Sequence, residues 1–356
     1  MKSINLIILI LISLPACSQL PENKRVQSLQ KLQQTFEPKL YQLPPRIQGH
    51  YGLRMFRLSG KEEYLQSSLI DLYSVTDAQR FYACSSDDQA FIKHQANIMI
   101  DQLGNGPRAR ARKKAIQPWP EFIFYADALL RYGSRIDALG FYSPCHSKML
   151  QALKDYDLTE AITDPAMIKS WAAQLANYVY WSEQLNSGDY IAAYTKAFKN
   201  VYADDKDSNL SKRQFKNKIY GMTHFIFAAS HYYQKRISAK EFKWILDYFQ
   251  NNIDRIINET SNDVIAEVGV SFLLAEQYQH PVVARCQDHI ISQIDPHYNM
   301  ILSPSGRFDL ASGEHRNMLA LMLLNGMQSP LHPGPNLASY SQLASYLPKG
   351  LQPLPK

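Results

Sequence analysis

Residues 264–275 read VIAEVGVSFLLA, a stretch that is apolar around the whole helix circumference apart from Glu267 and Ser271. A helix that is apolar all round must be buried on every side. The next stretch, 282–294 (VVARCQDHIISQI), is amphipathic with helical period, so one face suits the core and the other suits solvent. Together the two stretches predict a buried inner helix covered by an outer helix.

The preceding part of the chain repeats this arrangement. Residues 222–230 (MTHFIFAAS) are mostly apolar, and residues 241–255 (EFKWILDYFQNNIDR) are amphipathic. Strand-like alternation and Asn-Gly or Asp-Gly hairpins between apolar runs do not occur in the sequence. The runs with helical period are 63–76, 88–103, 120–133, 166–185, 188–201, 219–235, 238–258, 262–278, 280–293 and 313–326. The sequence therefore predicts an all-α fold.

Starts of buried helices recur at a regular interval. They fall near Tyr51, Pro120, Trp171, Tyr220, Asp263 and Gly313, with spacings of 69, 51, 49, 43 and 50 residues. A two-helix unit repeated six times predicts inner and outer rings of helices. Over residues 50–330 this layout resembles the (α/α) toroid shared by many polysaccharide-active enzymes and cyclases. It is also similar to an uncharacterised bacterial family of secreted proteins, a domain-of-unknown-function family. An irregular helical bundle or a solenoid is the alternative.

The N-terminus has the three parts of a secretion signal. Lys2 supplies the positive start, residues 4–14 are almost wholly apolar, and Ala16 precedes Cys17. The apolar run is too short to span a membrane, which needs about 20 residues. The segment 14–17 (LPAC) resembles the bacterial lipobox, which implies cleavage after residue 16 and lipidation of Cys17. A plain signal peptide with a chance cysteine is the alternative.

Lipidation would hold the mature protein on a membrane without a spanning helix, because several acyl chains together anchor stably. The resemblance to lipoproteins, with Ser18 after the cysteine, favours the outer membrane of a Gram-negative cell envelope. Residues 17–48 are then expected to be the lipidated cysteine and a polar tether, in which 24–36 suits a short amphipathic helix. Residues 49–330 would form the toroid domain, and residues 331–356 a Pro-rich C-terminal tail.

Composition and charge favour a carbohydrate or acidic ligand over a nucleic acid. Apolar residues make up 46% of the chain, and 22 tyrosines accompany 15 phenylalanines, which suits core packing and a cleft that stacks on sugar rings. The net charge of +6 is mild, and its one dense cluster lies in residues 108–114 (RARARKK), on a solvated helix face or beside an acidic ligand. Export argues against a nucleic-acid partner.

Three cysteines follow Cys17, and export places them in an oxidising compartment where a disulfide persists. Cys84 and Cys145 lie in loop-like sequence and form the best predicted pair. Cys286 lies in a helix-like run and is expected to be a buried free thiol. The absence of a close Cys-x-x-Cys pair argues against a thiolate zinc site.

In toroids the cavity opens at the N-terminal ends of the inner helices, where exposed amides and helix dipoles favour anions. The candidate site residues are therefore the polar and aromatic side chains in those first turns. They are Arg54, Trp119, Glu121, Tyr220, His224, Asp263, Glu267, Glu314, His315, Arg316 and Asn317. No His-x-x-x-His or His-Glu-x-x-His spacing occurs, so neither a metal nor another cofactor is expected.

Glu267 is the most informative candidate because all its neighbours are apolar or glycine. A buried carboxylate shifts its pKa upward, which suits a general acid. In a hydrolase Glu267 would be the acid, and Glu314 or Asp263 the base or nucleophile. The remaining polar candidates would orient a carbohydrate on which Trp119 and Tyr220 stack. In a lyase, His224 or a tyrosine would be the base, and Arg316 would neutralise a uronate.

The alternatives are structural. Glu267 would instead pair with Arg54, Arg316 or a helix end, and His224 would be a hydrogen-bonded core residue. A Gly-x-Ser-x-Gly elbow, a Walker loop and a dinucleotide fingerprint are absent from the sequence, which disfavours those enzyme classes. Two hypotheses therefore remain: a lipid-anchored envelope protein that binds or cleaves a carbohydrate or cell-wall polymer, or a non-catalytic binding or assembly lipoprotein.

Overall fold

The computed structural model describes residues 19–354, and the described chain is almost entirely helical. The predicted signal peptide and Cys17 lie outside the described residues. The helices are α1 (Gln19–Phe36), α2 (Pro45–Ser59), α3 (Leu65–Ala83), α4 (Gln89–Asp101), α5 (Pro107–Ile116), α6 (Arg131–Ala138), α7 (His146–Asp155), α8 (Thr159–Thr163), α9 (Pro165–Gln184), α10 (Ile191–Val201), α11 (Lys212–Ala229), α12 (Lys243–Asn251), α13 (Ile253–Glu259), α14 (Asn262–Leu274), α15 (Pro281–Ser292) and α16 (Leu310–Asn325).

Shorter elements join these helices. The 3-10 segments are η1 (Glu37–Gln42), η2 (Glu62–Tyr64), η4 (Asp204–Asn209), η5 (Leu337–Ser339) and η6 (Ser341–Tyr346), and η3 (Phe124–Leu130) is a π-helical segment. Two two-residue strands, β1 (Phe141–Tyr142) and β2 (Gln352–Pro353), pair antiparallel. The prediction of an all-α fold is confirmed. The predicted helical runs do not include α7 and α8, because these helices are short and only partly apolar.

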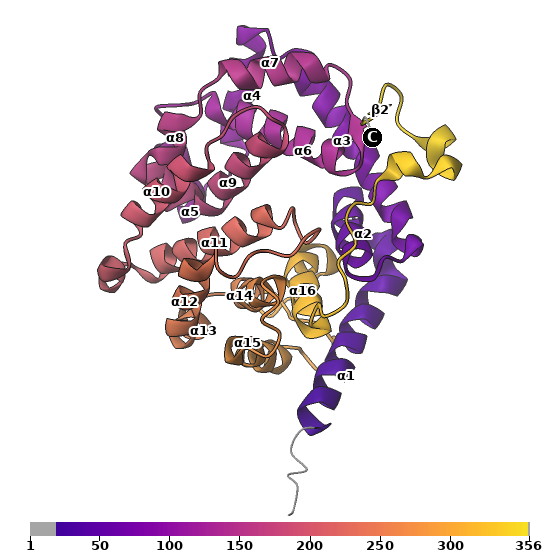
Figure 1. Ribbon diagram of the computed structural model, residues 1–356, viewed down its shortest axis with the longest axis vertical. Helices are drawn as coiled ribbons and strands as arrows, with labels where there is room; N and C mark the ends of the chain where they lie inside the picture. Colours follow the sequence, from indigo (N-terminus) through magenta and orange to yellow (C-terminus); the bar gives the residue numbers. More distant parts are fainter. Residues whose placement is uncertain (1–18, 355–356) are drawn as a thin grey trace, which may run out of the picture.

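The long helices contact one another in a closed order. The contacts run from α2 through α3, α6, α9, α11, α14 and α16, and α16 returns to α2. Figure 1 shows these helices around the middle of the molecule, with α10, α12, α13 and α15 on the outside. The order agrees with paired inner and outer helices, and the (α/α) toroid itself remains a prediction. Within residues 19–354, no helix is long and apolar enough to cross a membrane.

The inner helices are held close by their sequence. Ser211 and Gln214 form a reciprocal capping box that begins α11, and Asp164 accepts a hydrogen bond from the Met167 amide (2.8 Å) at the start of α9. A Cβ atom at Gly221 would lie 2.9 Å from the Cβ of Ala172, so glycine is required where α11 crosses α9. The N-terminal ends of these two helices are therefore fixed side by side.

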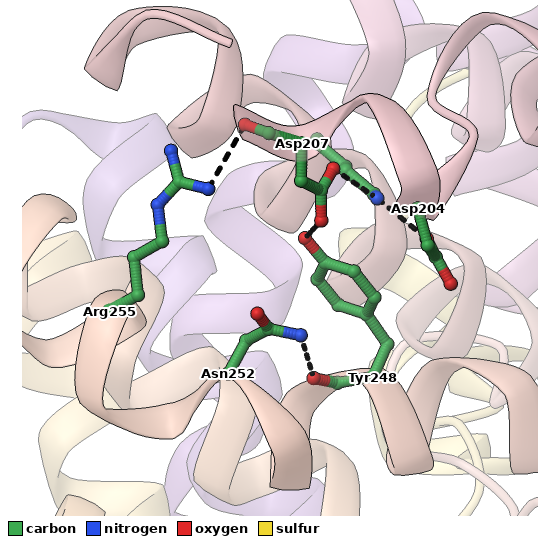
Figure 2. A network of polar contacts seen from close by, with 6 residues as sticks. Asp204, Asp207, Tyr248, Asn252 and Arg255 are labelled. Carbon is green, nitrogen blue, oxygen red and sulfur yellow. Dashed lines mark hydrogen bonds and ion pairs between the residues drawn. The ribbon is translucent and has the colours of Figure 1, made fainter. Parts of the chain in front are cut away.

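The start of α11 is also supported by a buried lysine. Lys218 is fully buried, and its ammonium group contacts Asp204 and Asp207 of η4 at 2.7 Å each. The Tyr248 hydroxyl donates to Asp207, and Arg255 donates to the Asp207 carbonyl at 3.2 Å (Figure 2). The polar stretch 203–211, which contains η4, is thereby anchored to the core.

Two segments expected outside the domain are packed against it. α1 contacts α16, and Leu32, Phe36 and Leu43 are buried, so the described part of the expected tether belongs to the helical domain. Apolar residues at helical spacing explain this difference, because they need a surface to cover them. In the expected tail Leu337 is buried, and its amide donates to the Leu139 carbonyl at 3.0 Å.

The cysteine predictions are confirmed for the described residues. Cys84, after the end of α3, and Cys145, before the start of α7, form a disulfide. Cys286 lies in α15 as a buried free thiol, and burial raises its pKa to about 12. The disulfide ties two helices that pack beside η3.

Candidate functional site

One cavity lies at the N-terminal ends of α9, α11 and α14, and we call it the N-face cavity. Its volume is about 520 Å³, within the usual range for ligand pockets. The lining residues that carry its chemistry are Arg108, Lys169, Arg213, Lys216, Tyr220, Asp263 and His315. Four permanent cations thus face one carboxylate, and the helix N-termini add to the positive potential. The cavity therefore suits an anionic ligand.

Asp263 is the single acidic side chain of the N-face cavity. Burial opposes its ionisation, but the hydrogen bond from the Ser261 hydroxyl and the charge of Lys216 outweigh burial and lower its pKa. Asp263 is therefore an anion at neutral pH, and it partly offsets the cations around it.

Tyr220 and His224 lie one turn apart on α11, with their rings 4.5 Å apart edge to face. Burial raises the pKa of Tyr220, so its phenol stays protonated, and the Arg108 guanidinium lies 5.5 Å from its ring. The Nδ1 atom of His224 is 3.0 Å from the Asn177 amide oxygen. Burial lowers the pKa of His224 to about 3, so its imidazole is neutral with Nδ1 as the donor. Its Nε2 atom is buried without a partner.

The second cavity lies at the C-terminal ends of α6, α9 and α11 and along α2, and we call it the C-face cavity. Its volume is about 220 Å³. Its lining includes Arg46, His50, Arg54, Arg57, Asp71, Arg131, Arg135, Tyr180, Trp181 and Tyr232. The two cavities share α9 and α11 as walls but have no lining residue in common.

A thin polar wall separates the cavities. His50 lines the C-face cavity, His315 lines the N-face cavity, and their ring centroids are 5.4 Å apart. The Nδ1 atom of His50 lies 2.8 and 2.7 Å from the two carboxyl oxygens of Glu314. Burial raises the pKa of Glu314 to about 7 and lowers the pKa of His50, so below pH 7 the proton resides on Glu314 and the imidazole is neutral.

Glu267 supports the wall from α14. Its side chain is 1% exposed, and one carboxyl oxygen accepts a hydrogen bond from Thr223 at 2.7 Å. The other oxygen lies 3.9 Å from Nε2 of His315 and has no hydrogen-bond donor. Burial and the nearby Asp263 charge raise its pKa, as the sequence predicts for a carboxyl group in apolar surroundings. The alternative, a pair with Arg54 or Arg316, is absent from the ion pairs of the described residues.

The predicted site residues fall into three groups. Tyr220, Asp263 and His315 line the N-face cavity, and Arg54 lines the C-face cavity. Glu267, Glu314 and His224 are buried and line neither cavity.

The third group lies apart from both cavities. Trp119, Glu121 and Arg316 line neither one, and the Trp119 indole N–H donates to Glu160 at 3.5 Å. Asn317 is structural, because it bonds the Ile301 amide (2.7 Å) and the Ile301 carbonyl (3.0 Å). A polar side chain near a helix start can bind either a ligand or a neighbouring loop, and Asn317 binds the loop at Ile301.

The candidates predicted from the sequence did not include most of the charged lining residues, among them Arg46, Arg57, Asp71, Arg131 and Arg135 of the C-face cavity. Lys169, Arg213 and Lys216 lie in the first turns of α9 and α11, and His50 lies in α2. The signal was present in residues 211–218 (SKRQFKNK), where a capping serine precedes several cations at a helix start. Within the described residues, no group of three His, Cys, Asp or Glu side chains is placed to hold a metal ion.

Fold and site together define an all-α protein with a basic cavity at the N-terminal ends of its helices. The chain belongs to the family described as a domain of unknown function (DUF3541), whose model matches residues 25–354. The match includes α2 and the C-terminal segment, in agreement with their packing on the helical domain. Neither the curated proteins nor the solved structures gave a match to the chain.

Proposed function

We propose that this protein binds an acidic carbohydrate polymer in the N-face cavity while a lipid at Cys17 holds it in the bacterial cell envelope. The observation that carries the proposal is the lining of that cavity, where Arg108, Lys169, Arg213 and Lys216 face a single carboxylate at the starts of three helices. These cations have no carboxylate partner within 4.0 Å among residues 19–354, so they are available to an anionic ligand.

The size and surroundings of the cavity favour a polymer over a single small anion. A volume of about 520 Å³ has room for more than one sugar ring, and Tyr220 offers an aromatic surface for stacking. α5 forms one wall through Arg108 and continues with the exposed cations Arg110 and Lys114.

The test is a titration of fluorescently labelled oligosaccharides, polygalacturonate against neutral dextran of equal length, into the folded protein. We expect polygalacturonate to bind and dextran to bind at least tenfold more weakly. The double variant Arg213→Met/Lys216→Met should weaken polygalacturonate binding at least about tenfold, because charge-assisted hydrogen bonds are lost. Lys196→Met, a change of an exposed lysine on α10, is the control for overall charge. Equal affinities for both polymers would contradict the proposal.

A second candidate function, cleavage by β-elimination, is favoured by one specific observation: a neutral imidazole and a protonated phenol line the same basic cavity. The pKa of His315 is lowered to about 4 by loss of water around its ring and by the positive charge of Arg54. His315 is thus a free base at neutral pH. Its exposed surface, 45% of the side chain, faces the cavity.

The β-elimination on a uronate unit would begin with removal of a proton. Nε2 of His315 takes the proton from the carbon next to the carboxylate, whose negative charge Lys216 neutralises. The electron pair forms a carbon–carbon double bond, the glycosidic carbon–oxygen bond breaks, and Tyr220 donates its proton to the leaving oxygen. Hydrolysis by Glu267 and Glu314 fits less well, because two carboxyl groups must flank an open pocket and both of these are 1% exposed.

Elimination is tested by the ultraviolet absorbance of the new conjugated double bond. His315→Gln and Tyr220→Phe should each abolish the absorbance rise and leave polygalacturonate affinity within about threefold. A protein that binds polygalacturonate without any absorbance rise would be a binding protein alone, which is the non-catalytic alternative.

A further inference from the structure

The C-face cavity is a second concentration of positive charge, at the opposite end of α9 and α11 from the N-face cavity. Five arginines line it, and Asp71 is its only carboxylate. Such a density of guanidinium groups in one small cavity is costly unless anions compensate for it. The partners of the arginines therefore decide whether the cavity is complete without a ligand.

Three of the arginines are occupied by the protein. Arg135 pairs with Asp71, and Arg131 pairs with Asp127 at 3.0 Å. Arg57 donates to the carbonyls of Gly334 (2.8 Å) and Tyr232 (2.9 Å). These contacts fix the shape of the cavity and hold the C-terminal segment against it.

Arg46 and Arg54 remain without an acidic partner. No carboxylate oxygen lies within 4.0 Å of either guanidinium among the described residues. Arg54 donates to the His50 carbonyl at 3.2 Å, its guanidinium lies 5.5 Å from the Tyr233 ring, and its buried Nε–H has no acceptor. Both arginines lie on α2, two turns apart, so their planar groups reach the cavity from one side.

The remaining walls are aromatic. The rings of Trp181 and Tyr232 lie 6.3 Å apart with an interplanar angle of 24°, and Tyr180 adds a third ring. Aromatic faces beside guanidinium forks are suited to a ring that carries a carboxylate or phosphate group. The volume of about 220 Å³ is below the range of drug-sized sites and suits one sugar-sized ring, not a chain.

We propose that the C-face cavity is a second binding site, specific for a single sugar-sized ring that bears a carboxylate or phosphate. Arg46 and Arg54 bind the anionic group, and Trp181 and Tyr232 contact the ring. This site is independent of the proposed polymer site, because the two cavities share no lining residue.

The experiment is isothermal titration of the full folded protein with glucuronate, glucose 6-phosphate and, as neutral control, glucose. We expect binding of at least one of the two anions and none of glucose at the same concentration. Whichever anion binds more tightly identifies the group, carboxylate or phosphate, that the cavity recognises. Arg46→Gln, at an exposed position, should weaken that binding at least about tenfold, and Arg54→Gln should have a similar or larger effect.

The matched control is Lys196→Met on α10, which should leave the affinity for the small anion unchanged, and Lys216→Met tests whether the ligand occupies the N-face cavity instead. Absence of binding of both anions at millimolar concentration would overturn the proposal. Binding that survives Arg46→Gln and Arg54→Gln but is lost with Lys216→Met would also overturn it, because the ligand would then occupy the N-face cavity. Failure of polygalacturonate binding alone would leave this site intact.

Discussion

The N-face and C-face cavities are both basic, yet they use their cations differently. Lys169, Arg213 and Lys216 lie at or near the rim of the N-face cavity, unpaired with acids. In the C-face cavity most arginines are held by Asp71, Asp127 or backbone carbonyls. Exposed cations around a larger cavity tolerate many positions of a ligand, whereas a smaller cavity whose shape is fixed by paired arginines admits few. The difference indicates that the N-face cavity suits a repetitive polymer and the C-face cavity a defined small ligand.

The largest effect is expected from breaking the buried ion pairs of Lys218, which support the N-face cavity and not the C-face cavity. Lys218→Met leaves Asp207 without its ammonium partner beneath the start of α11, and should cost about 3–5 kcal/mol of unfolding free energy. In the folded fraction of Lys218→Met, the affinity of the N-face cavity for polygalacturonate should fall, and the affinity of the C-face cavity for the small anion should stay the same. Denaturant unfolding and titration measure both.

The control for Lys218→Met is Lys243→Met, which breaks an exposed pair with Asp247 and should cost less than about 0.5 kcal/mol. Equal costs for the two variants would show that the buried network of Figure 2 does not support the N-face cavity.

A smaller effect is expected from removing the disulfide that supports the C-face cavity. The Cys84–Cys145 disulfide closes a loop of 61 residues and ties α3, which carries Asp71, to α7. Replacing both cysteines with alanine should cost about 2–4 kcal/mol, with faster hydrogen exchange in α3 and α7 than in α14. Reductant should destabilise the natural protein and leave the variant unchanged. A cost below about 0.5 kcal/mol would argue against this link.

The wall between the cavities gives a pH-dependent prediction. The folded-state pKa of Glu314 is about 7, above its usual value of 4.5. The protonated carboxyl group therefore contributes to the unfolding free energy in full below pH 4.5, and this contribution is lost as pH rises through 7. Glu314→Gln removes this loss. The unfolding free energy of the variant, relative to the natural protein, should therefore increase by about 2–3 kcal/mol between pH 4.5 and 8. Glu63→Gln, at an exposed pair, should show a flat difference. A flat difference for Glu314→Gln would contradict the assignment.

The smallest effect concerns salt. Raising ionic strength from about 0.05 to 0.5 M should weaken polygalacturonate binding several-fold, because exposed charges are screened. Binding of the small anion in the C-face cavity should change less than about threefold, because a single anionic group meets only two unpaired arginines and fewer charge contacts are screened. Titrations at both ionic strengths measure this difference, and equal salt dependence would remove the distinction between the two cavities.

Local pattern was enough to predict part of this molecule. The apolar run 264–275 predicts a buried helix and the buried Glu267, and the helix starts predict Tyr220, Asp263 and His315 at one cavity. These features depend on periodicity and on the dipole of a helix end, both of which are visible in a short window. The loop context of Cys84 and Cys145 likewise indicated their pairing.

The remaining features depend on partners far apart in the chain. His50 and Glu314 are separated by 264 residues, so no local pattern could indicate that they meet. Lys218 reads as a solvated cation in SKRQFKNK, and only η4 folded over it makes it a core residue. The C-face cavity was not predicted because the candidates were drawn from the expected starts of six inner helices, whereas its arginines lie along α2 and in α6.

The polar wall between the cavities is thin, so a ligand charge in one cavity acts on a ligand charge in the other. Tyr220 and Ala228 line opposite cavities from α11, and at about 1.5 Å of rise per residue they are roughly 12 Å apart. Two negative charges at that separation repel by about 1.4 kcal/mol at an effective dielectric constant of about 20, which is a factor of about ten in affinity. Occupancy of one cavity therefore disfavours occupancy of the other, and by linkage the penalty is reciprocal. If both proposed ligands bind, accumulation of the small acid would weaken polymer binding without any moving part.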